Sequence, residues 1–516
     1  MRAVIAGALL LVGAGWPTES HDVRRTGQSD VRGPRSATRV SSVVLTAEQS
    51  VNMPVTVAND GTLFVGTWGL VRSAGASNPH TWNKFDGKLF AYDANLTRKW
   101  TAPLDLTPYC YSYGSREPEC SGGGTLNGYN GTVEGVVSID AARKRIYVGR
   151  GDGKLYALDA KTGAVLWRFK SFNPVDPADP EGGGEAVAGP LVAPDGTIYF
   201  TTARAGAYET NAVYAVSPAG TLLWRYPKNT ASLPHVVWAA PALSPDGKTL
   251  YVAPGWGPAA NDWDRMLQGI VYAFDAATGA VKWTFAPRNE AEWWKPTVWT
   301  THLAVGTDGI LYGSGAEYTF SGASAVVFAL RDRGTSATYA WPRMIDVDRN
   351  RATISLGLAL RETGGVTRRV YASSGNGYST LAQSYPRGGN LVAVDAASGS
   401  LLWTFDPEAH GGTGAMSGIA IDNEGVIYTG VSGANVGGRV FAIREDGSLL
   451  WQFPLGGLLE WAHPVLGPGG DLYVADTRRC VWMTFPIETG LCNAFDVNPR
   501  LYAIENDMPR RRSVRR

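Results

Sequence analysis

The sequence predicts an all-β fold, an eight-bladed β-propeller of four-stranded antiparallel blades, from three observations. A phrase of the type Y-A-x-D recurs eight times, its alanines 49 to 66 residues apart. Most copies follow a hairpin-like segment, and seven precede a tryptophan. Units of four short strands repeating at this period are typical of propeller blades. The alanines are Ala91, Ala157, Ala215, Ala273, Ala329, Ala393, Ala442 and Ala503.

The upstream segment supplies the first two strands of each unit. Examples are "VTVANDGTLFVGT" from Val55, "LVAPDGTIYFTT" from Leu191 and "ALSPDGKTLYVAP" from Ala242. Asp-Gly between two apolar runs is the strongest short signal for a β-hairpin. The third strand is then the Y-A-x-D phrase, and a Thr-Gly turn leads to a fourth strand that contains the tryptophan.

The segment "GKLYALDAKTGAVLW" from Gly153 shows the expected role of each repeated residue. Ala157 lets strands approach closely, Asp159 accepts hydrogen bonds from the turn, and Gly163 allows a backbone conformation that side chains resist. The tryptophan brings a large apolar ring and an indole N–H to the boundary between blades. We expect this packing role for Trp167, Trp224, Trp283, Trp403 and Trp451, with Trp100 and Trp341 as further copies.

The last unit lacks its fourth strand, because "RLYAIEND" runs into the tail without a tryptophan. The segment "ATRVSSVVLTAE" (37–48) precedes the first full hairpin and is expected to complete the last blade, which would close the ring and remove a sheet edge. The expected organisation is a signal peptide at 1–15, an extended leader at 16–36, the propeller at 37–507 and a basic disordered tail at 508–516.

Charge and hydropathy limit the partners and the location. The net charge of +1 does not indicate a surface that binds nucleic acid. The apolar run from Ala3 to Gly15 follows one arginine and is too short to span a bilayer. It is either a secretory signal peptide or a frayed apolar N-terminus. We expect a monomer without a membrane span, exported to the periplasm or secreted, with a protein or glycan partner.

The four cysteines fall into two local pairs within polar insertions, Cys110 with Cys120 and Cys480 with Cys492. This spacing suits two disulfides that staple loops in an oxidising compartment, and four free thiols are the alternative. Neither pair has the spacing of zinc ligands, and the absence of C-x-x-C-H excludes covalently attached haem.

The motif A-x-D-x-x-T-G-x-x-x-W is complete at 157–167 and 273–283, and has Ser for Thr at 393–403. It resembles the tryptophan-docking motif of pyrroloquinoline-quinone (PQQ) propellers, and the leader resembles those of exported bacterial proteins with PQQ-like repeats. The resemblance covers almost the whole chain. It implies the fold but not the function, since the superfamily contains quinoprotein alcohol and sugar dehydrogenases and also quinone-free scaffolds such as the outer-membrane assembly lipoprotein.

Two segments resemble calcium-binding parts of the quinoprotein dehydrogenases. "GSGAEY" contains Glu317 and resembles the G-x-S-G-A-E segment, and "VYASSGNGY" contains Asn376 and resembles the V-Y-x-G-T-G-N segment. The resemblance makes Glu317 and Asn376 candidate ligands for calcium and for PQQ, because carboxylate and amide oxygens suit Ca²⁺. The alternative is that Glu317 is a turn carboxylate and Asn376 a turn asparagine.

Two departures weigh against quinone catalysis. The following unit reads "DPEAHGGTGAMSG" where these dehydrogenases have an Asp-rich segment with the catalytic base, so only Asp406, Glu408 or His410 could substitute. The vicinal cysteine pair of several alcohol dehydrogenases is also absent. Without a base the quinone has no partner to take the alcohol proton. We therefore expect a binding or scaffolding module without a cofactor, with a PQQ- and calcium-dependent dehydrogenase as the alternative.

Loop tryptophans are the other candidates for ligand contacts. They could stack on a ligand or plug the propeller channel. These residues are Trp256, Trp263, Trp293, Trp294 and Trp299. Four dispersed histidines lie near strand starts in different units and could form a composite metal site or a polar ring, and they are His235, His302, His410 and His463.

Overall fold

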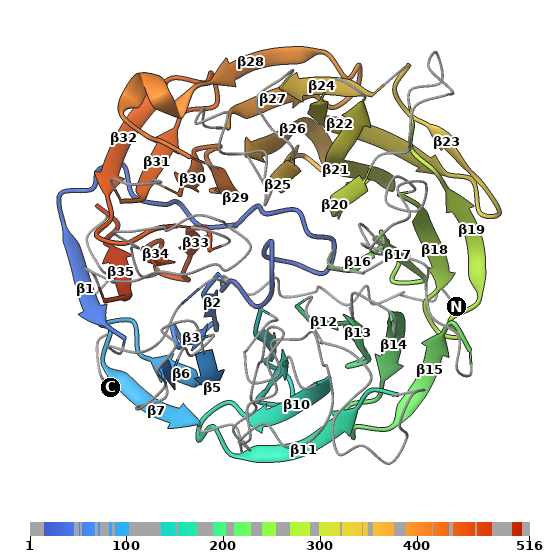
Figure 1. The fold of residues 1–516 in the computed structure, drawn as a ribbon, viewed down its shortest axis with the longest axis horizontal. Coiled ribbons are helices and arrows are strands. Elements are labelled where there is room, and N and C mark those ends of the chain that lie inside the picture. The colour runs from blue at the N-terminus through green and yellow to red at the C-terminus, as the bar shows by residue number, and fades with distance from the viewer. Residues whose placement is uncertain are drawn as a thin grey trace, which may run out of the picture.

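The computed structural model describes the propeller strands and the segment that precedes them (Figure 1). The described residues are 15–45, 51, 54–67, 71–72, 82–84, 88–102, 136–150, 153–172, 189–202, 211–228, 240–253, 269–288, 299–319, 322–342, 344–348, 354–375, 389–414, 416–432, 437–459, 462–476 and 498–507.

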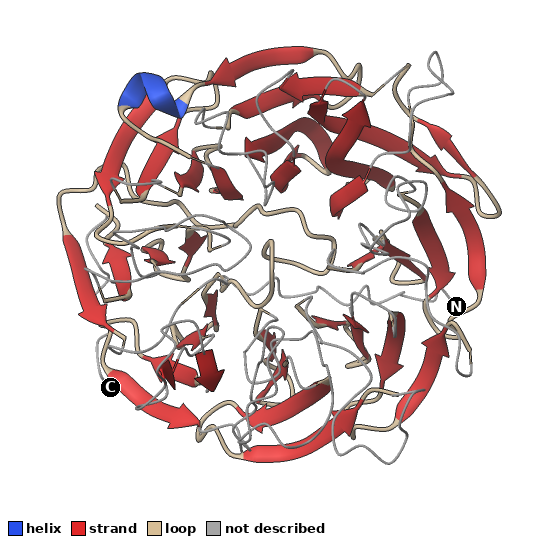
Figure 2. Ribbon diagram, viewed as in Figure 1, coloured by secondary structure: helices blue, strands red, loops and turns tan. Residues whose placement is uncertain are grey.

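Eight sheets stand in a ring, as the sequence predicted, and we number these blades along the chain (Figures 1 and 2). Blade 1 contains β2 (Thr56–Val57), β3 (Leu63–Gly66), β6 (Leu89–Tyr92) and β7 (Arg98–Ala102). Blade 2 contains β8 (Ser138–Asp140), β9 (Arg145–Gly149), β10 (Lys154–Asp159) and β11 (Val165–Lys170). Blade 3 contains β12 (Leu191–Val192), β13 (Ile198–Thr202), β14 (Ala212–Val216) and β15 (Leu222–Tyr226). Blade 4 contains β16 (Ala242–Leu243), β17 (Thr249–Val252), β18 (Val271–Asp275) and β19 (Val281–Phe285).

The second half of the ring repeats the pattern. Blade 5 contains β20 (Trp299–Val305), β21 (Ile310–Thr319), β22 (Gly322–Asp332) and β23 (Ala337–Tyr339), with β24 (Ile345–Asp348) also on β22. Blade 6 contains β25 (Ile354–Thr363), β26 (Val366–Gly375), β27 (Leu391–Asp395) and β28 (Leu401–Phe405). Blade 7 contains β29 (Met416–Ile421), β30 (Ile427–Val431), β31 (Arg439–Ile443) and β32 (Leu449–Pro454). Blade 8 contains β33 (Val465–Leu466), β34 (Leu472–Ala475), β35 (Arg500–Ile504) and β1 (Val40–Val44). A separate two-stranded sheet pairs β4 (Val71–Arg72) with β5 (Trp82–Lys84).

The N-terminal strand closes the ring, which confirms the prediction from the sequence. β1 pairs antiparallel with β35 along its whole length, from Val40 opposite Ile504 to Val44 opposite Arg500. The first and last parts of the chain therefore share one sheet, which completes blade 8 and closes the ring.

Blades 5 and 6 differ from the expected short strands. In blade 5 only two residues separate β21 from β22, so the two strands stay paired as far as Thr319 opposite Gly322. In blade 6 β25 and β26 pair up to Thr363 opposite Val366. Gly364 and Gly365 form the turn, and their φ values of 62° and 74° suit a two-residue hairpin.

The repeated alanine and tryptophan lie opposite each other and connect neighbouring blades. Ala157 is the register partner of Trp167, and the same pairing recurs in five other blades. The indole N–H of Trp167 donates to Pro218 O of the next blade at 3.1 Å. In the same way Trp224 donates to Ala276 O at 2.9 Å and Trp403 to Glu445 O at 3.1 Å. Each ring thus spans the boundary between two sheets.

Two tryptophans find a different acceptor. Trp283 donates to the Oδ1 atom of Asp332 at 2.9 Å. Trp451 of blade 7 donates at 3.0 Å to Pro34 O, which precedes the propeller in sequence. Blade 8 ends in β1 instead of a Thr-Gly hairpin, so the usual turn carbonyl is replaced by one from the N-terminal segment.

That segment, residues 15–36, is here called the strap, and it crosses the centre of the ring (Figure 1). It contacts all eight blades. Its main chain pairs with inner strands through Trp16 and Val57, Pro17 and Ile139, Val23 and Leu243, Arg24 and Val305, Thr26 and Leu360, and Gly27 and Ile421. Side-chain hydrogen bonds add blade 3, from Arg25 to Gly189 O, and blade 8, from Asn506 to Arg32 O.

Candidate functional site

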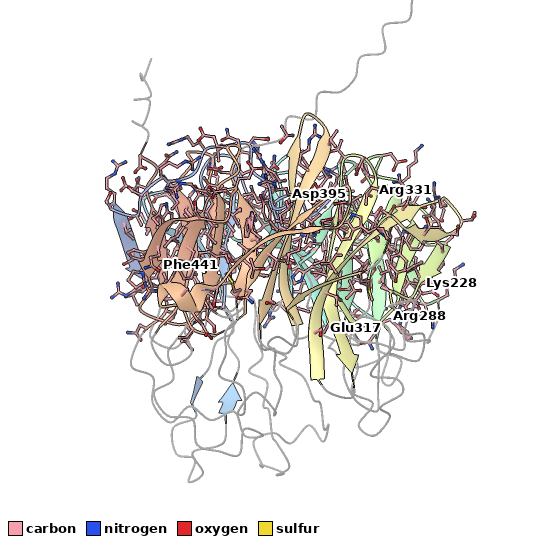
Figure 3. The ribbon with its side chains drawn as sticks, turned by 90° about the horizontal axis from the view of Figure 1, so that it is seen from above. Lys228, Arg288, Glu317, Arg331, Asp395 and Phe441 are labelled. Atoms are coloured by element: carbon pink, nitrogen blue, oxygen red, sulfur yellow. The ribbon has the colours of Figure 1, made fainter. Side chains whose placement is uncertain are left out.

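Glu317 lies at the far end of blade 5 from the strap. The strap rests on the turns between the first and second strands, as at Asn423, whose N–H donates to Val31 O. β21 begins at Ile310 beside such a turn and runs to the opposite face, where Glu317 is labelled (Figure 3). Glu317 faces Ser324 in register and is 5% exposed. A buried carboxylate at a strand end is compatible with a ligand role or a structural one.

The position of Asn376 matches that of Glu317 in the repeat but lies outside the described residues. Glu317 comes five residues after Tyr312, which pairs with Ala329, and Asn376 comes five residues after Tyr371, which pairs with Ala393. The two residues therefore occupy equivalent positions in the sequence repeats of adjacent blades. Their roles as calcium or PQQ ligands stay predictions.

Polar side chains at the ends of the second strands hold the start of the third strand in several blades. Thr67 Oγ1 accepts from Lys88 N at 2.9 Å, and Ser374 Oγ accepts from Asn390 N at 2.9 Å. Asp476 does the same in blade 8, with Oδ1 accepting from Arg500 N at 2.6 Å. These groups satisfy buried main-chain donors, which is a structural role.

Asp476 is the acidic group among these three, and its pKa is shifted from the usual value of an aspartate. Its side chain is fully buried and also accepts hydrogen bonds from Gly457 N at 2.7 Å and from the Tyr502 hydroxyl at 3.0 Å. Burial raises the pKa of Asp476 to about 6, although the hydrogen bonds from Arg500 and Gly457 oppose this shift. The buried carboxylate is therefore poised to take up a proton in mildly acidic solution.

Asp476 is expected to stabilise the fold as the pH falls from about 7.5 to 5. The folded-state pKa lies above the unfolded one, so this contribution is full below the unfolded pKa and is lost as the pH rises through about 6. In Asp476→Asn the contribution should vanish. Urea unfolding should show wild type gaining about 1 kcal/mol on the variant between these two pH values. If the free energy of unfolding depended on pH in the same way in both proteins, the raised pKa of Asp476 would be contradicted.

The candidate substitutes for a catalytic base lie on the rim of the propeller. Asp406 caps the short 3-10 helix η4 (Pro407–His410), with its side chain accepting from Glu408 N at 2.9 Å. The His410 ring stacks on Phe405, with centroids 5.0 Å apart. η4 follows the outermost strand of blade 6 and lies at the outer edge of the ring (Figure 2). These residues are therefore remote from the strand ends that face the channel.

Most of the loop candidates cannot be placed. Trp256, Trp263, Trp293, Trp294 and all four cysteines lie outside the described residues, as do His80 and His235. Only the backbone of Trp299 is described, and it pairs with Ala316 in blade 5. Within the described ranges no three His, Cys, Asp or Glu side chains are grouped to hold a metal ion, and no helix is long and apolar enough to cross a membrane.

The strap builds a cluster at the channel that carries no signal in the sequence. Trp16 is fully buried, and the rings of His21 and His463 lie against it at centroid distances of 4.9 and 6.4 Å. His463 comes from blade 8 and occupies the space beside Gly418, where a Cβ atom would lie 2.6 Å from its Nδ1 atom. The sequence left open a composite metal site or a polar ring formed by four histidines. Of these, His463 lies in this cluster and His302 lowers its pKa, whereas His410 lies on the rim and His235 is outside the described residues.

A family model described as outer membrane protein assembly factor BamB matches residues 33–293 and 387–491. Among curated proteins, polyvinylalcohol dehydrogenase from Pseudomonas sp is 25% identical over an alignment of 368 positions, which covers 63% of this chain and 54% of that protein. Quinohemoprotein alcohol dehydrogenase ADH IIB from Pseudomonas putida is 30% identical over 125 residues, 24% of this chain and 17% of that one. The chain thus spans about half of one curated relative and a smaller part of the other.

Solved structures show the same fold at low identity. A europium-containing methanol dehydrogenase superposes with a TM-score of 0.58 at 14% identity, covering 95% of this chain and 98% of that one. BamB from Moraxella catarrhalis gives 0.50 at 15% identity, covering 92% and 98%. These likenesses support the propeller alone, whereas the family model covers more than half of the sequence. The chain belongs to the PQQ-like repeat family described as outer membrane protein assembly factor BamB.

Proposed function

We propose that the protein is a binding or scaffolding propeller rather than a quinoprotein enzyme. The observation that carries this proposal is the place of Asp406, Glu408 and His410 on the rim, remote from Glu317. Acid–base catalysis needs a base within hydrogen-bond reach of the substrate. The strap also covers one side of the ring centre, which favours the opposite face for a partner.

A protein is the partner that the family favours, since its model is described as an outer membrane protein assembly factor. A glycan or small molecule on the tryptophan-rich loops is the other class that we retain. We also propose that the protein is exported to the periplasm or secreted. The apolar N-terminal run after a single arginine supports this location.

A PQQ- and calcium-dependent dehydrogenase is the second candidate function. Two observations favour it: the match to polyvinylalcohol dehydrogenase over 63% of the chain, and the equivalent positions of Glu317 and Asn376 in adjacent blades. Calcium takes about six to eight oxygen ligands, and Glu317 is the single candidate within the described residues. The donor set is therefore incomplete, and we derive no reaction step through the quinone.

Titration of the purified protein with PQQ and Ca²⁺ tests both functions. Absorbance and calorimetry should show no calcium-dependent binding, and dye reduction with alcohols or sugars should stay at the level without protein. Tight binding with turnover would overturn the scaffold proposal. In that event Glu317→Ala should abolish the calcium-dependent binding while the circular dichroism spectrum stays unchanged. Asp446→Ala is the matched control, because Asp446 is a fully exposed turn carboxylate.

A further inference from the structure

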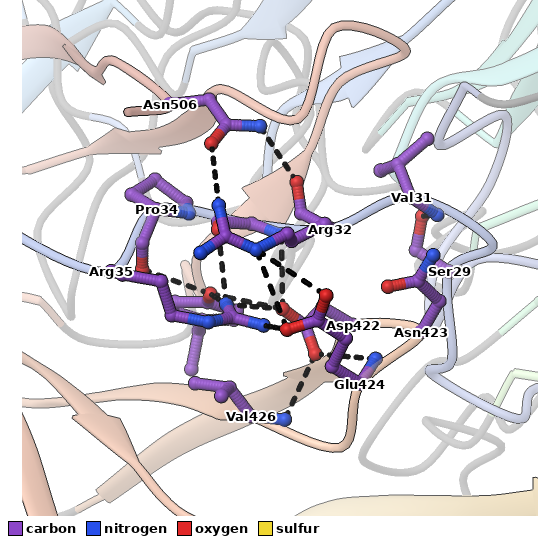
Figure 4. Close-up of polar contacts among 12 residues, drawn as sticks. Ser29, Val31, Arg32, Pro34, Arg35, Asp422, Asn423, Glu424, Val426 and Asn506 are labelled. Atoms are coloured by element: carbon purple, nitrogen blue, oxygen red, sulfur yellow. Dashed lines mark hydrogen bonds and ion pairs between the residues drawn. The ribbon is translucent and has the colours of Figure 1, made fainter. Parts of the chain in front are cut away.

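The two ends of the strap are held to the propeller by different chemistry. Residues 24–36 are anchored by charged pairs. Arg24 donates to both carboxylate oxygens of Glu362 at 2.9 and 2.8 Å, and Arg35 contacts Asp422 and Glu424 at 2.5 and 2.6 Å (Figure 4). Burial alone would raise the pKa of Glu362, but the hydrogen bonds from Arg24 hold it below its usual value. The pair between Arg24 and Glu362 therefore persists into acidic solution.

Residues 15–22 pack around the buried ring of Trp16, and their main chain also forms hydrogen bonds with Val57 and Ile139. The rings of His21 and His463 both meet the indole edge to face, at interplanar angles of 64°. Their side chains are 3% and 5% exposed. Among the described residues, neither the indole N–H of Trp16 nor Nε2 of His21 or His463 has a hydrogen-bond partner of good geometry.

Burial disfavours the protonated form of both histidines, and the charged groups around the cluster offset this only in part. Burial lowers the pKa of His21, while Asp22, Asp30 and a hydrogen bond to the Gly15 backbone oppose the shift and Arg24 assists it. Burial lowers the pKa of His463 to about 3, and His302 adds to the effect.

Arg25 is buried nearby in the strap and makes hydrogen bonds to Thr18 and to the carbonyls of Glu19, Gly189 and Pro241. The carboxyl of Glu19 faces Arg25, and burial raises its pKa.

We propose that acid opens the strap from its N-terminal end. Residues 15–22 leave blades 1, 2 and 8, and His21 and His463 take up protons as they become exposed, so a falling pH favours the open state. Residues 24–36 remain on blades 3 to 8. A buried charge without a partner is strongly unfavourable, and hydration outside the ring relieves it. The hydrogen bond that Ile139 N donates to Pro17 O and the bridge between Trp16 and Val57 break with the cluster. The hydrogen bonds that Arg25 donates to Thr18 and to Glu19 O break as well. The centre of the ring then becomes open on the strap side.

Hydrogen exchange of the full-length protein at about pH 7.5 and 4.5, corrected for intrinsic rates, tests the proposal. The amides of Val57 and Ile139 should exchange at least about tenfold faster at the lower pH. The amides of Leu360 and Ile421, which pair with the arginine-anchored part, should not change. Uniform protection at both pH values, or an equal loss along the whole strap, would overturn the proposal.

Variants identify the titrating groups. His21→Gln with His463→Gln should make the protection of Val57 and Ile139 independent of pH, because glutamine does not titrate. His410→Gln is the matched control and should open like wild type, since His410 lies on the rim. If the double variant fails to fold, the single variant His21→Gln should shift the opening to lower pH. Opening of the variants at the wild-type pH would assign the effect to other groups and refute the proposal.

Discussion

Replacing Asp422 by alanine is expected to lower the free energy of unfolding by about 4 kcal/mol. The Asp422 side chain is fully buried and lies 2.5 Å from the Arg35 guanidinium of the strap. It also accepts from the main-chain N–H groups of Gly33 and Val426, each at 2.9 Å (Figure 4). The substitution leaves a largely buried guanidinium and two buried donors without their acceptor, and both losses are costly. Urea unfolding measures the change.

Glu424→Ala is the control for this prediction. Glu424 pairs with the same guanidinium at 2.6 Å, but its side chain is 55% exposed. An exposed ion pair contributes at most about 1 kcal/mol, so the variant should unfold almost like wild type. Limited proteolysis should cut the strap readily in Asp422→Ala and not in Glu424→Ala. Equal effects of the two substitutions would show that burial does not decide the strength of this anchor.

The blades could be predicted because each one repeats the same short sequence pattern and the same local contacts. The Y-A-x-D phrase, the Asp-Gly and Thr-Gly turns and the tryptophan all act between residues close in sequence or one unit apart, so periodicity reveals them. The last blade lacked a fourth strand in the sequence, and the segment at 37–48 lay before the first full hairpin, so the two were predicted to pair. β1 does pair with β35. The hairpin at Gly364 and Gly365 was missed because it lacks the Asp-Gly signal that blades 1, 3, 4 and 5 carry at this turn.

The strap could not be predicted, because its partners carry no sequence signal. It binds mainly to carbonyl and N–H groups of inner strands, such as Leu243, Val305 and Leu360, which every residue type supplies. Its ion pairs join residues more than three hundred positions apart, as in Arg24 with Glu362. From the sequence alone, an extended segment without periodicity is predicted to be a simple leader, because its partners lie on one face only after the ring has formed.

For the same reason, the candidate site could be predicted only in part from the sequence. Glu317 was found from a resemblance, and the repeat places it at a strand end on the face away from the strap. The position of a base depends on how the connection after blade 6 folds. There Pro407 and the Asp406 cap favour a short helix on the rim, and no local pattern ties that helix to the channel.

Gly279→Ala is expected to destabilise the protein by about 3 kcal/mol. Gly279 lies in the turn between β18 and β19 with a φ of +70°, a conformation that alanine resists. A Cβ atom there would lie 2.5 Å from Cδ2 of Trp224, whose indole N–H is bound to Ala276 O. The ring is held in the boundary between blades 3 and 4 and cannot move aside, so overlap adds to backbone strain. Thermal and urea unfolding measure the loss.

Gly247→Ala separates the two costs. Gly247 also has a φ of +70°, but no atom lies within 4 Å of the place that an alanine Cβ would take. Backbone strain alone should cost about 1 to 2 kcal/mol at this position. In a Trp224→Ala background, Gly279→Ala should fall to the same value, because the overlapping ring is gone. If Gly279→Ala costs no more than Gly247→Ala in the native background, the contact between turn glycine and tryptophan does not limit how closely the blades pack.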